Sequence, residues 1–432
     1  MKITQRIVFL VFVLCGLNAM SQPYFSVTDY GAVADGTTLN TDAFQKTVDA
    51  CHEEGGGTVL VPAGTYYTAG FQLKENVSLH LASGALLIAS INIEDYVVFG
   101  NKRVFILGDS LQNVSISGKG KIDGSGSSFY DENFEPDENR PTPFIYFSKS
   151  SGISIKGIEL FHSPGHVIRV QNCDGVVIHD VRIINDLRTP NTDAVDIGDT
   201  KNVTISNCYF ESGDDLICLK SSKDTVENVV VTNCVLISDD SAIKFGTGSH
   251  VATRFCSFSN LVIRNTRYGI AFFMLDGGVF EHNSFSDITI ESGGRSTHHY
   301  PIYIDVDKRK PDRDYGIIQH NTFENIQIIS DGKVLISGHP ESPITNLTLR
   351  NCSFVSTGMA DFSNAKKPRG NKNYPSLNTS TDLSREDAYF VFGYMNQSTF
   401  ENIQVFIEEG SNRPAFTQKK VDAEFDFSTS KP

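Results

Sequence analysis

Three aspartates are the residues of this sequence best suited to acid–base chemistry. Asp193 stands in NTDAVDI, and Asp214 and Asp215 stand in SGDDLICLK. Asp215 follows Asp193 by 22 residues. Carboxylates that crowd together repel one another, so their pKa values are driven apart. One carboxyl can then keep its proton as a general acid while another stays ionised as a base. This pairing is the chemistry that breaks glycosidic bonds.

A solenoid of stacked coils would bring these aspartates together. The spacing of 22 residues is close to one turn of a parallel β-helix, in which each coil stacks on the one before. Equivalent residues of adjacent coils lie about 4.8 Å apart. We therefore expect Asp193 and Asp215 to be stacked neighbours that each open a short strand, with Asp214 beside them.

A repeated phrase favours the same architecture. An apolar-x-apolar triplet, often preceded by Asn or Gly, occurs as NVSI at 113, GISI at 152, GVVI at 175, NVTI at 202, NVVV at 228 and NLVI at 260, and the last copy is NIQV at 402. An irregular repeat of about 25 residues without intervening helices favours a parallel β-helix over a β-sandwich, and the crossover rule makes it right-handed. The predicted fold is therefore all-β, a single right-handed parallel β-helix of about ten coils over residues 25–410.

Four other stretches complete the predicted organisation. Residues 41–53 show one amphipathic helical pattern, which suits a cap over the open end of a solenoid. Two polar stretches, 123–143 and 357–387, break the repeat and could either wall a binding cleft or simply be solvated. The polar tail after about residue 410 is expected to be poorly ordered.

The N-terminus has the pattern of a secretory signal. Lys2 and Arg6 precede an apolar run, and the small residues Ala19 and Ser21 follow it. We therefore divide the chain into a signal peptide, residues 1–21, and a β-helix domain, residues 22–432. The protein is expected to be secreted or periplasmic.

Charge and cysteine content restrict the partners. The net charge of −14 argues against nucleic acid and against an anionic membrane. We expect a monomer that binds a polysaccharide or oligosaccharide, with no cofactor and no metal. Seven cysteines follow residue 21, an odd number without zinc-binding spacing, so we expect buried apolar side chains rather than disulfides. The asparagines that precede Cys208, Cys234 and Cys352 are expected to be turn residues in the left-handed conformation.

The coil spacing also gives a register for the residues around the aspartates. Two ladders result: Asp193, Asp215 and Ser241 form one, and Asp196, Cys218, Lys244 and Ala271 form the other. Lys244 lies in the apolar run AIKFG, where a charge needs a partner or a ligand. We expect Lys244 to contact substrate; the alternative is that it only neutralises Asp196 and the aspartates. Lys220 and Asp240 lie nearby in the same register and are further candidates for substrate binding.

The sequence resembles the polygalacturonase-type glycosidases of glycoside hydrolase family 28 over about residues 26–330. The resemblance rests on DYGAVADG, NTDAFQKTVDAC and GGGTVLVPAGTY near the start, and on FHSPGHVIRV, NTDAVD and SGDDLICLK. It implies a right-handed parallel β-helix that hydrolyses pectic polymers with inversion. It also implies that Asp214 is the general acid and that Asp193 and Asp215 are bases that activate water.

The sequence departs from this family at the substrate-binding positions. The family's GHG histidine aligns with Ser241, and its RIK pair, which grips a galacturonate carboxylate, aligns with Ala271 and Phe273. These changes predict a different sugar or an exo-acting preference, with Lys244 as a replacement cation.

Aromatic residues must supply any face on which a sugar stacks, since the chain has no Trp. The candidates are Tyr268, Phe272, Phe273 and Tyr303, although some of these phenylalanines are better explained as core residues. Tyr268 is the one we expect to bind substrate.

Two other classes of function stay open. A Ca²⁺-dependent polysaccharide lyase on the same fold would bind the ion through Asp193, Asp214, Asp215 and Asp240 and use a Lys or Arg as base. A non-catalytic glycan-binding or adhesive β-helix would need none of the aspartates. The paired NTD and GDD motifs favour the hydrolase.

Overall fold

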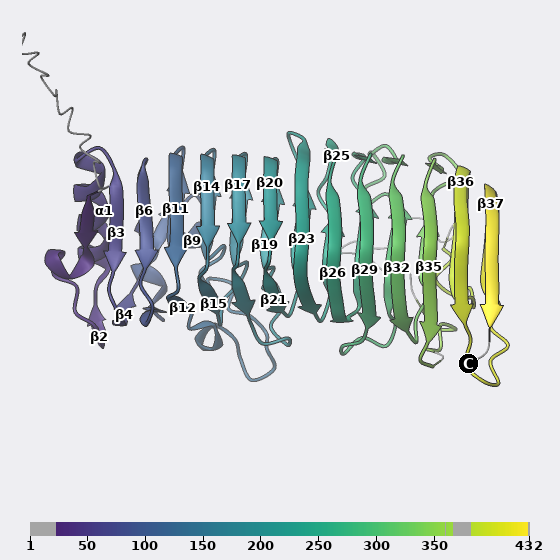
Figure 1. The fold of residues 1–432 in the computed structure, drawn as a ribbon, viewed down its shortest axis with the longest axis horizontal. Helices are drawn as coiled ribbons and strands as arrows, with labels where there is room; N and C mark the ends of the chain where they lie inside the picture. Colours follow the sequence, from purple (N-terminus) through teal and green to yellow (C-terminus); the bar gives the residue numbers. More distant parts are fainter. Residues whose placement is uncertain (1–22, 359, 366–381, 431–432) are drawn as a thin grey trace, which may run out of the picture.

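The chain folds into a right-handed parallel β-helix. The computed structural model describes residues 23–358, 360–365 and 382–430, so the predicted signal peptide lies outside the described residues. In Figure 1 the strands that face the viewer run from top to bottom while the coils advance from left to right, which is a right-handed winding. The predicted fold class is confirmed, and no helix among the described residues is long and apolar enough to cross a membrane.

The first sheet runs the length of the solenoid and is the row of long arrows in Figure 1. All of its neighbouring strands are parallel. Its strands are, in spatial order, β1 (Tyr24–Ser26), β3 (Gly57–Val61), β6 (Val77–Leu81), β11 (Gln112–Gly118), β14 (Ser151–Lys156), β17 (Asp174–His179), β20 (Lys201–Ser206), β23 (Val226–Ser238), β26 (Ser257–Thr266), β29 (Ser284–Ser292), β32 (Thr322–Ser330), β35 (Thr348–Ser356), β36 (Phe390–Phe406) and β37 (Phe416–Ser430).

The second sheet follows the first within each coil of the N-terminal half and ends on the long strand β23. It consists of β2 (Asp35–Leu39), β4 (Gly64–Thr68), β7 (Ala85–Ala89), β12 (Lys121–Asp123), β15 (Glu159–Phe161), β18 (Arg182–Ile184) and β21 (Tyr209–Ser212). A shorter parallel ladder then leads from β23 to β36 through β25 (Ala252–Arg254), β28 (Val279–Glu281), β31 (Ile317–Gln319) and β34 (Ile344–Thr345).

The third sheet carries the residues of chemical interest, and we call it the site sheet. It consists of β5 (Phe71–Gln72), β10 (Ile106–Asp109), β13 (Ile145–Ser148), β16 (Ile168–Gln171), β19 (Val195–Gly198), β22 (Ile217–Lys220), β24 (Ser241–Phe245), β27 (Tyr268–Met274), β30 (Tyr300–Val306) and β33 (Val334–Ser337), which pairs with β36. Three short 3-10 helices, Val27–Tyr30, Ile93–Asp95 and Gly126–Phe129, lie in the connections.

Stacked apolar side chains fill the interior. Alternation along each strand sends every second residue inward, and the repeat places equivalent residues on top of one another. Phe258, Phe285 and Phe323 show the result: their rings stack with centroids 4.9 and 4.7 Å apart, and all three are fully buried. The spacing of the sequence repeat is therefore the spacing of the core.

The turns between the strands use the residues expected of them. Asn207, Asn233 and Asn351 have φ angles of 56°, 55° and 52°, which confirms the predicted left-handed turns. The amide of Asn233 donates a hydrogen bond of 3.2 Å to Asn207 Oδ1, so the turns also form a polar ladder. All seven described cysteines are buried, as predicted.

Helix α1 (Thr41–Glu53) covers the N-terminal end of the solenoid, as predicted (Figure 1). Phe44, Val48 and Cys51 are fully buried on its inner side, and the rings of Phe44 and Phe71 lie 5.4 Å apart. The apolar face of the helix thus covers core that the first coil would leave open.

The prediction for the C-terminal tail is wrong. Residues 416–430 form strand β37, which pairs in parallel with β36 and adds a coil beyond the predicted end at about residue 410. Phe425 and Phe427 alternate with polar residues, which is the period of a strand with one face on the core. They pack against Phe400 and Phe390 of β36, with ring centroids 5.0 and 5.4 Å apart.

Both polar stretches that interrupt the repeat pack against the solenoid. Tyr130, in stretch 123–143, donates hydrogen bonds to the carbonyls of Pro164 and Pro190, and the stretch walls a cavity of about 410 Å³. In stretch 357–387, of which residues 359 and 366–381 are outside the described residues, Phe362 and Leu383 pack on the outer face of the site sheet. Neither stretch is simply solvated: the first lines a cavity, and the second covers part of the site sheet.

A hairpin covers the N-terminal end of the outer face of the site sheet. Strands β8 (Val97–Phe99) and β9 (Lys102–Val104) form an antiparallel pair apart from the solenoid. Phe99 and Val104 pack with Leu107 and Tyr146, which point outward from β10 and β13. The Phe99 and Tyr146 rings lie 5.8 Å apart.

Candidate active site

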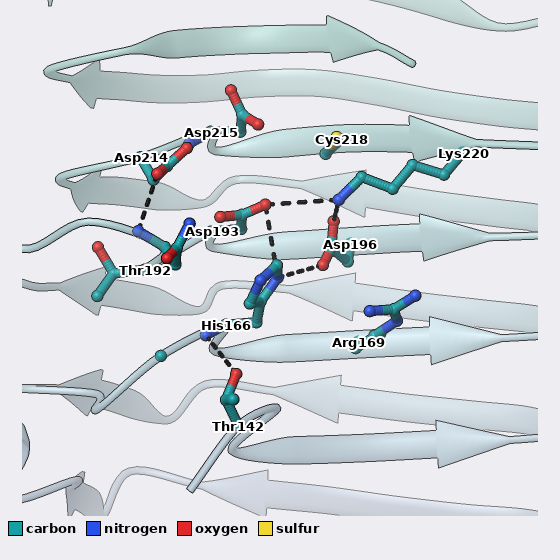
Figure 2. Close-up of polar contacts among 12 residues, drawn as sticks. Thr142, His166, Arg169, Thr192, Asp193, Asp196, Asp214, Asp215, Cys218 and Lys220 are labelled. Atoms are coloured by element: carbon teal, nitrogen blue, oxygen red, sulfur yellow. Dashed lines mark hydrogen bonds and ion pairs between the residues drawn. The ribbon is translucent and has the colours of Figure 1, made fainter. Parts of the chain in front are cut away.

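The structure confirms the predicted register around the aspartates. Asp196 pairs with Cys218, Cys218 with Lys244, and Lys244 with Ala271, each on the next coil. Val195 pairs with Ile217 on the next coil. Asp193 and Asp215 each lie two residues before one of these, so they occupy equivalent positions on neighbouring coils. Figure 2 shows Asp193, Asp196, Asp215 and Cys218 on one face of the site sheet.

The SGDD turn has a steric reason for its glycine. A Cβ on Gly213 would lie 2.2 Å from the carbonyl oxygen of Thr189, so only glycine lets the chain pass this close. The turn then presents Asp214 toward the neighbouring coil. Its carboxylate accepts hydrogen bonds from the backbone N–H of Asn191, at 2.8 Å, and of Asp215, at 2.9 Å.

The turn that carries Asn191 is itself held from two sides. Arg140, from the first polar stretch, donates to Asn191 Oδ1 at 3.2 Å. Arg295, from the connection after β29, donates to the carbonyl of Leu187 at 3.2 Å and forms an ion pair of 2.7 Å with Asp239. Segments far apart in the sequence therefore fix the position of Asp214.

Asp214 lies in an environment that favours its protonated form. Oxygens of Asp214, Asp215 and Asp240 all lie within 4.8 Å of one another. Burial, reinforced by the charges of Asp193 and Asp215, raises the pKa of Asp214 to about 7, although Lys244 and the N–H of Asn191 act in the opposite direction. Burial and the charges of Asp215 and Asp214 likewise raise the pKa of Asp240 to about 7. The cluster therefore contains two carboxyl groups that can hold a proton near neutral pH.

The two lysines divide the remaining aspartates between them. Lys244 Nζ lies 2.5 Å from Asp215 Oδ2, whereas Lys220 Nζ lies 2.7 Å from Asp196 Oδ1 and 3.6 Å from Asp193 (Figure 2 shows Lys220). Lys244 is 8% exposed, so most of its surface is already covered by protein. The structure thus places Lys244 against Asp215 rather than Asp196.

A histidine that sequence reasoning missed completes the cluster. His166 Nδ1 contacts Asp196 Oδ2 in a very short hydrogen bond and lies 3.5 Å from Asp193 (Figure 2). Burial acts to lower the pKa of His166, but the charges of Asp193 and Asp196 outweigh it and raise the pKa. Burial also raises the pKa of Asp193 despite the opposing charges of His166 and Lys220.

The position of His166 follows from the same ladder as the aspartates. Ile168 pairs with Val195, so His166 stands one coil before Asp193 in the equivalent position. Extending the ladder one coil back from Asp193 would have found it. The position of the family's missing histidine holds Ser241, and this histidine reaches the aspartates from the opposite side.

Asp196 stays ionised. Burial acts to raise its pKa, but the charges of Lys220 and His166 and the hydrogen bond from His166 overcome that effect and hold the pKa well below its usual range. Its role is to hold His166 and Lys220 in place beside Asp193.

The aromatic candidates do not present open faces. Tyr268 and Phe273 are 2% and 3% exposed, and Tyr303 is fully buried with them under Phe362. Phe272 points the other way, into the main core. Tyr268 has almost no exposed ring face, because it packs against Phe273, Tyr300 and Tyr303. Its binding of substrate stays a prediction.

The carboxylates alone would suit a divalent cation, since oxygens of Asp214, Asp215 and Asp240 converge. Lys244 already supplies positive charge to Asp215, and Arg267 lies 3.7 Å from Asp240. Lys244 and Arg267 thus already pair with carboxylates, Asp215 and Asp240, that a Ca²⁺ ion would need as ligands.

Comparison with known proteins identifies relatives with carbohydrate chemistry. The sequence model of the glycosyl hydrolases family 28 matches residues 51–369. A probable polygalacturonase of Vitis vinifera is 33% identical over 219 residues, which cover 46% of this chain and 44% of the relative. An exo-poly-alpha-D-galacturonosidase of Dickeya chrysanthemi is 27% identical over 250 residues, 44% of this chain and 41% of that protein. The matches span about half the length of such relatives.

The fold is also found among solved structures. The family 28 exopolygalacturonase of Yersinia enterocolitica superposes with a TM-score of 0.74 at 18% identity, covering 94% of this chain and 79% of that one. This likeness confirms the β-helix, and the family match covers both the NTD and GDD motifs.

Proposed function

The chain belongs to glycosyl hydrolase family 28, and on that premise we propose that it is a secreted glycosidase that hydrolyses a pectic polysaccharide or its oligosaccharides. The observation that carries the proposal is the contrast between Asp214 and Asp215. These adjacent carboxyl groups lie within 4.8 Å of each other, one with a pKa raised to about 7 and the other in an ion pair with Lys244.

This contrast suits hydrolysis by two carboxyl groups. Asp214, protonated near neutral pH, donates its proton to the oxygen of the leaving sugar. Asp193 and Asp215, on neighbouring coils, hold and deprotonate the attacking water. Inversion of the anomeric carbon, by attack from the face opposite the leaving group, is taken from the resemblance to the family.

The extent of the open surface favours attack at a chain end. One outward ladder of the site sheet runs through Leu107, Tyr146, Arg169, Asp196, Cys218, Lys244, Ala271, Tyr303 and Leu335. The β8–β9 hairpin covers its first two residues, and the second polar stretch covers those from Ala271 onward. A long polymer that passes through the site needs an open path on both sides, and this face is covered on both sides. We propose exo-action on a terminal residue or a short oligosaccharide.

The names of the curated relatives supply the substrate class for the proposal. They include polygalacturonases and an exo-poly-alpha-D-galacturonosidase. Secretion rests on the signal-like pattern of residues 1–21.

Product analysis tests this function. The protein is incubated with polygalacturonic acid, rhamnogalacturonan and a sulfated galactan, and the products are separated by chromatography. We expect saturated products from a pectic substrate, with the smallest product released from the first time point and little loss of viscosity. Ca²⁺-dependent products that absorb in the ultraviolet would show a lyase instead. Binding without any product would show a glycan-binding protein.

A further inference from the structure

Arg169 is a cation beside the aspartates that forms no ion pair with an acidic side chain among the described residues, although its charge helps to lower the pKa of Asp196 on the next coil. It follows Tyr146 and precedes Asp196 in the outward ladder of the site sheet, as Figure 2 shows for Asp196 and Arg169. Its Nη2 donates to Gln171 Oε1 at 3.4 Å, while its Nε is buried with no hydrogen-bond partner. A buried guanidinium donor without a partner is costly, and a bound anion would supply the missing acceptor; the Nε atoms of Arg103, Arg140 and Arg267 share this state, but Arg169 is the one beside Asp196.

Lys102 is a second cation of this kind, and the β8–β9 hairpin carries it over the same surface. Its Nζ lies 5.9 Å from the centre of the Tyr146 ring and donates to Asn101 Oδ1 at 3.2 Å. No acidic side chain among residues 23–358 forms an ion pair with it. Burial and the charge of Arg169 lower the pKa of Lys102, which shows that the two cations lie close enough to repel.

The surroundings orient Arg169 rather than neutralise it. Gln171 Nε2 donates to Asp199 Oδ2 at 2.8 Å, which turns the Gln171 carbonyl oxygen toward the guanidinium. Asp199 is held in turn by the backbone N–H of Ser222 at 2.6 Å. Asp109, two coils earlier, keeps a buried oxygen without a hydrogen-bond partner and pairs with neither cation in the described structure.

We propose that Lys102 and Arg169 form a binding site for the carboxylate of the terminal acidic sugar of the substrate. A guanidinium matches a planar carboxylate with two parallel hydrogen bonds, and a lysine adds a point charge. Arg169 lies one strand spacing, about 4.8 Å, from Asp196. Because the hairpin covers the sheet beyond Arg169, a sugar bound there is the last of its chain.

This inference rests on the proposed function and gives it a substrate class. The family's carboxylate-gripping pair aligns with Ala271 and Phe273, which are buried here. The Lys102–Arg169 pair lies on the opposite side of the aspartates from those positions. The anion site would therefore have moved across the catalytic residues rather than been lost.

Calorimetric binding in an inactive background tests the proposal. Asp214→Asn is expected to slow turnover at least about a hundredfold, and in this background trigalacturonic acid, its methyl ester and a sulfated galactose oligosaccharide are titrated in turn. We expect the acid to bind, and Arg169→Gln to weaken that binding at least about tenfold, the usual scale for a charge-assisted hydrogen bond. Lys102→Met should weaken it in the same direction. Binding of the methyl ester should change less than about twofold.

The control is Lys156→Met, which removes an exposed lysine from β14 on another sheet. Arg169→Lys keeps the charge but loses the two parallel N–H donors of the guanidinium, so it replaces Arg169→Gln if that variant does not fold. Equal affinity of Arg169→Gln and the parent for the acid would overturn the proposal. A preference for the sulfated sugar that depends on Arg169 would overturn the choice of a carboxylate. The two proposals are separated in protein that keeps Asp214: cleavage of a pectic substrate that Arg169→Gln leaves unchanged would reject this site alone, whereas Arg169-dependent binding with no cleavage would reject the hydrolase alone.

Discussion

Lys244 Nζ lies 2.5 Å from Asp215 Oδ2, while Asp214, the preceding residue, is held by backbone N–H groups. Two adjacent residues thus meet different electrostatic environments. Asp215 has the positive charge of Lys244 at contact distance, whereas burial and neighbouring negative charge raise the pKa of Asp214 to about 7. Hydrolysis needs both a proton donor and an ionised carboxylate, and this asymmetry can supply both.

Lys244→Met should lower stability and activity together. The substitution keeps the length of the side chain but leaves Asp215, itself 2% exposed, without its counter-charge. Removing one partner of a buried ion pair costs about 3 to 5 kcal/mol. We expect a clearly lower melting temperature by calorimetry, against an unchanged value for Lys156→Met. An unchanged melting temperature with a higher KM would instead show that Lys244 contacts substrate.

His166→Gln should move the acidic limb of the pH–rate profile to higher pH. The charge of His166 opposes the effect of burial and so lowers the pKa of Asp193. Without that charge Asp193 takes up a proton at higher pH, and a base is lost earlier as the pH falls. The measurement is kcat/KM across the pH range, with His162→Gln as control because His162 lies 3.3 Å from Asp123 and not against Asp193. A profile that coincides with that of the parent would show that His166 does not act on the base.

Asp240→Asn should stabilise the protein in alkaline but not in acidic solution. Burial, then the charges of Asp215 and Asp214, raise the pKa of Asp240 from 3.8 to about 7. A raised carboxyl pKa contributes stability below the unfolded pKa, and that stability is lost as the pH rises through the folded pKa. The neutral amide avoids this loss, so at about pH 8 we expect a melting temperature higher by about 2 °C or more. At about pH 4 the two proteins should melt together; a destabilised variant at pH 8 would show that the Asp240 charge is needed.

The sequence repeat predicts the fold because it is the physical spacing of the coils. The same count places Asp193 under Asp215 and Asp196 under Cys218, so the backbone of the site also follows from the sequence. The wrong prediction of a poorly ordered C-terminal tail has a simple cause. Residues 416–430 have a polar composition but a strand period, and period decides whether Phe425 reaches the core.

Side-chain partners could not be predicted in the same way. A register names which residues are neighbours, but it does not say that Lys244 turns to Asp215 while Lys220 turns to Asp196. Tyr268 is buried in a cluster that also contains Phe362, a residue 94 positions later in an irregular stretch. Extending the ladder of Asp193 one coil back would have predicted the place of His166, but that segment has no acidic motif to draw attention to it.

The most direct test of the account compares two substrates in the Asp214→Asn variant. A proton donor is needed when a sugar leaves, but a nitrophenyl group leaves without one. On the pectic substrate we expect kcat to fall at least about a hundredfold, the usual scale of general acid catalysis. On a nitrophenyl glycoside of the same sugar the loss should be less than about tenfold. Asp240→Asn, the matched control, should show no such difference between substrates. Wild-type turnover of the pectic substrate by Asp214→Asn, or a substrate-dependent loss in Asp240→Asn instead, would contradict the assignment of Asp214 as the acid.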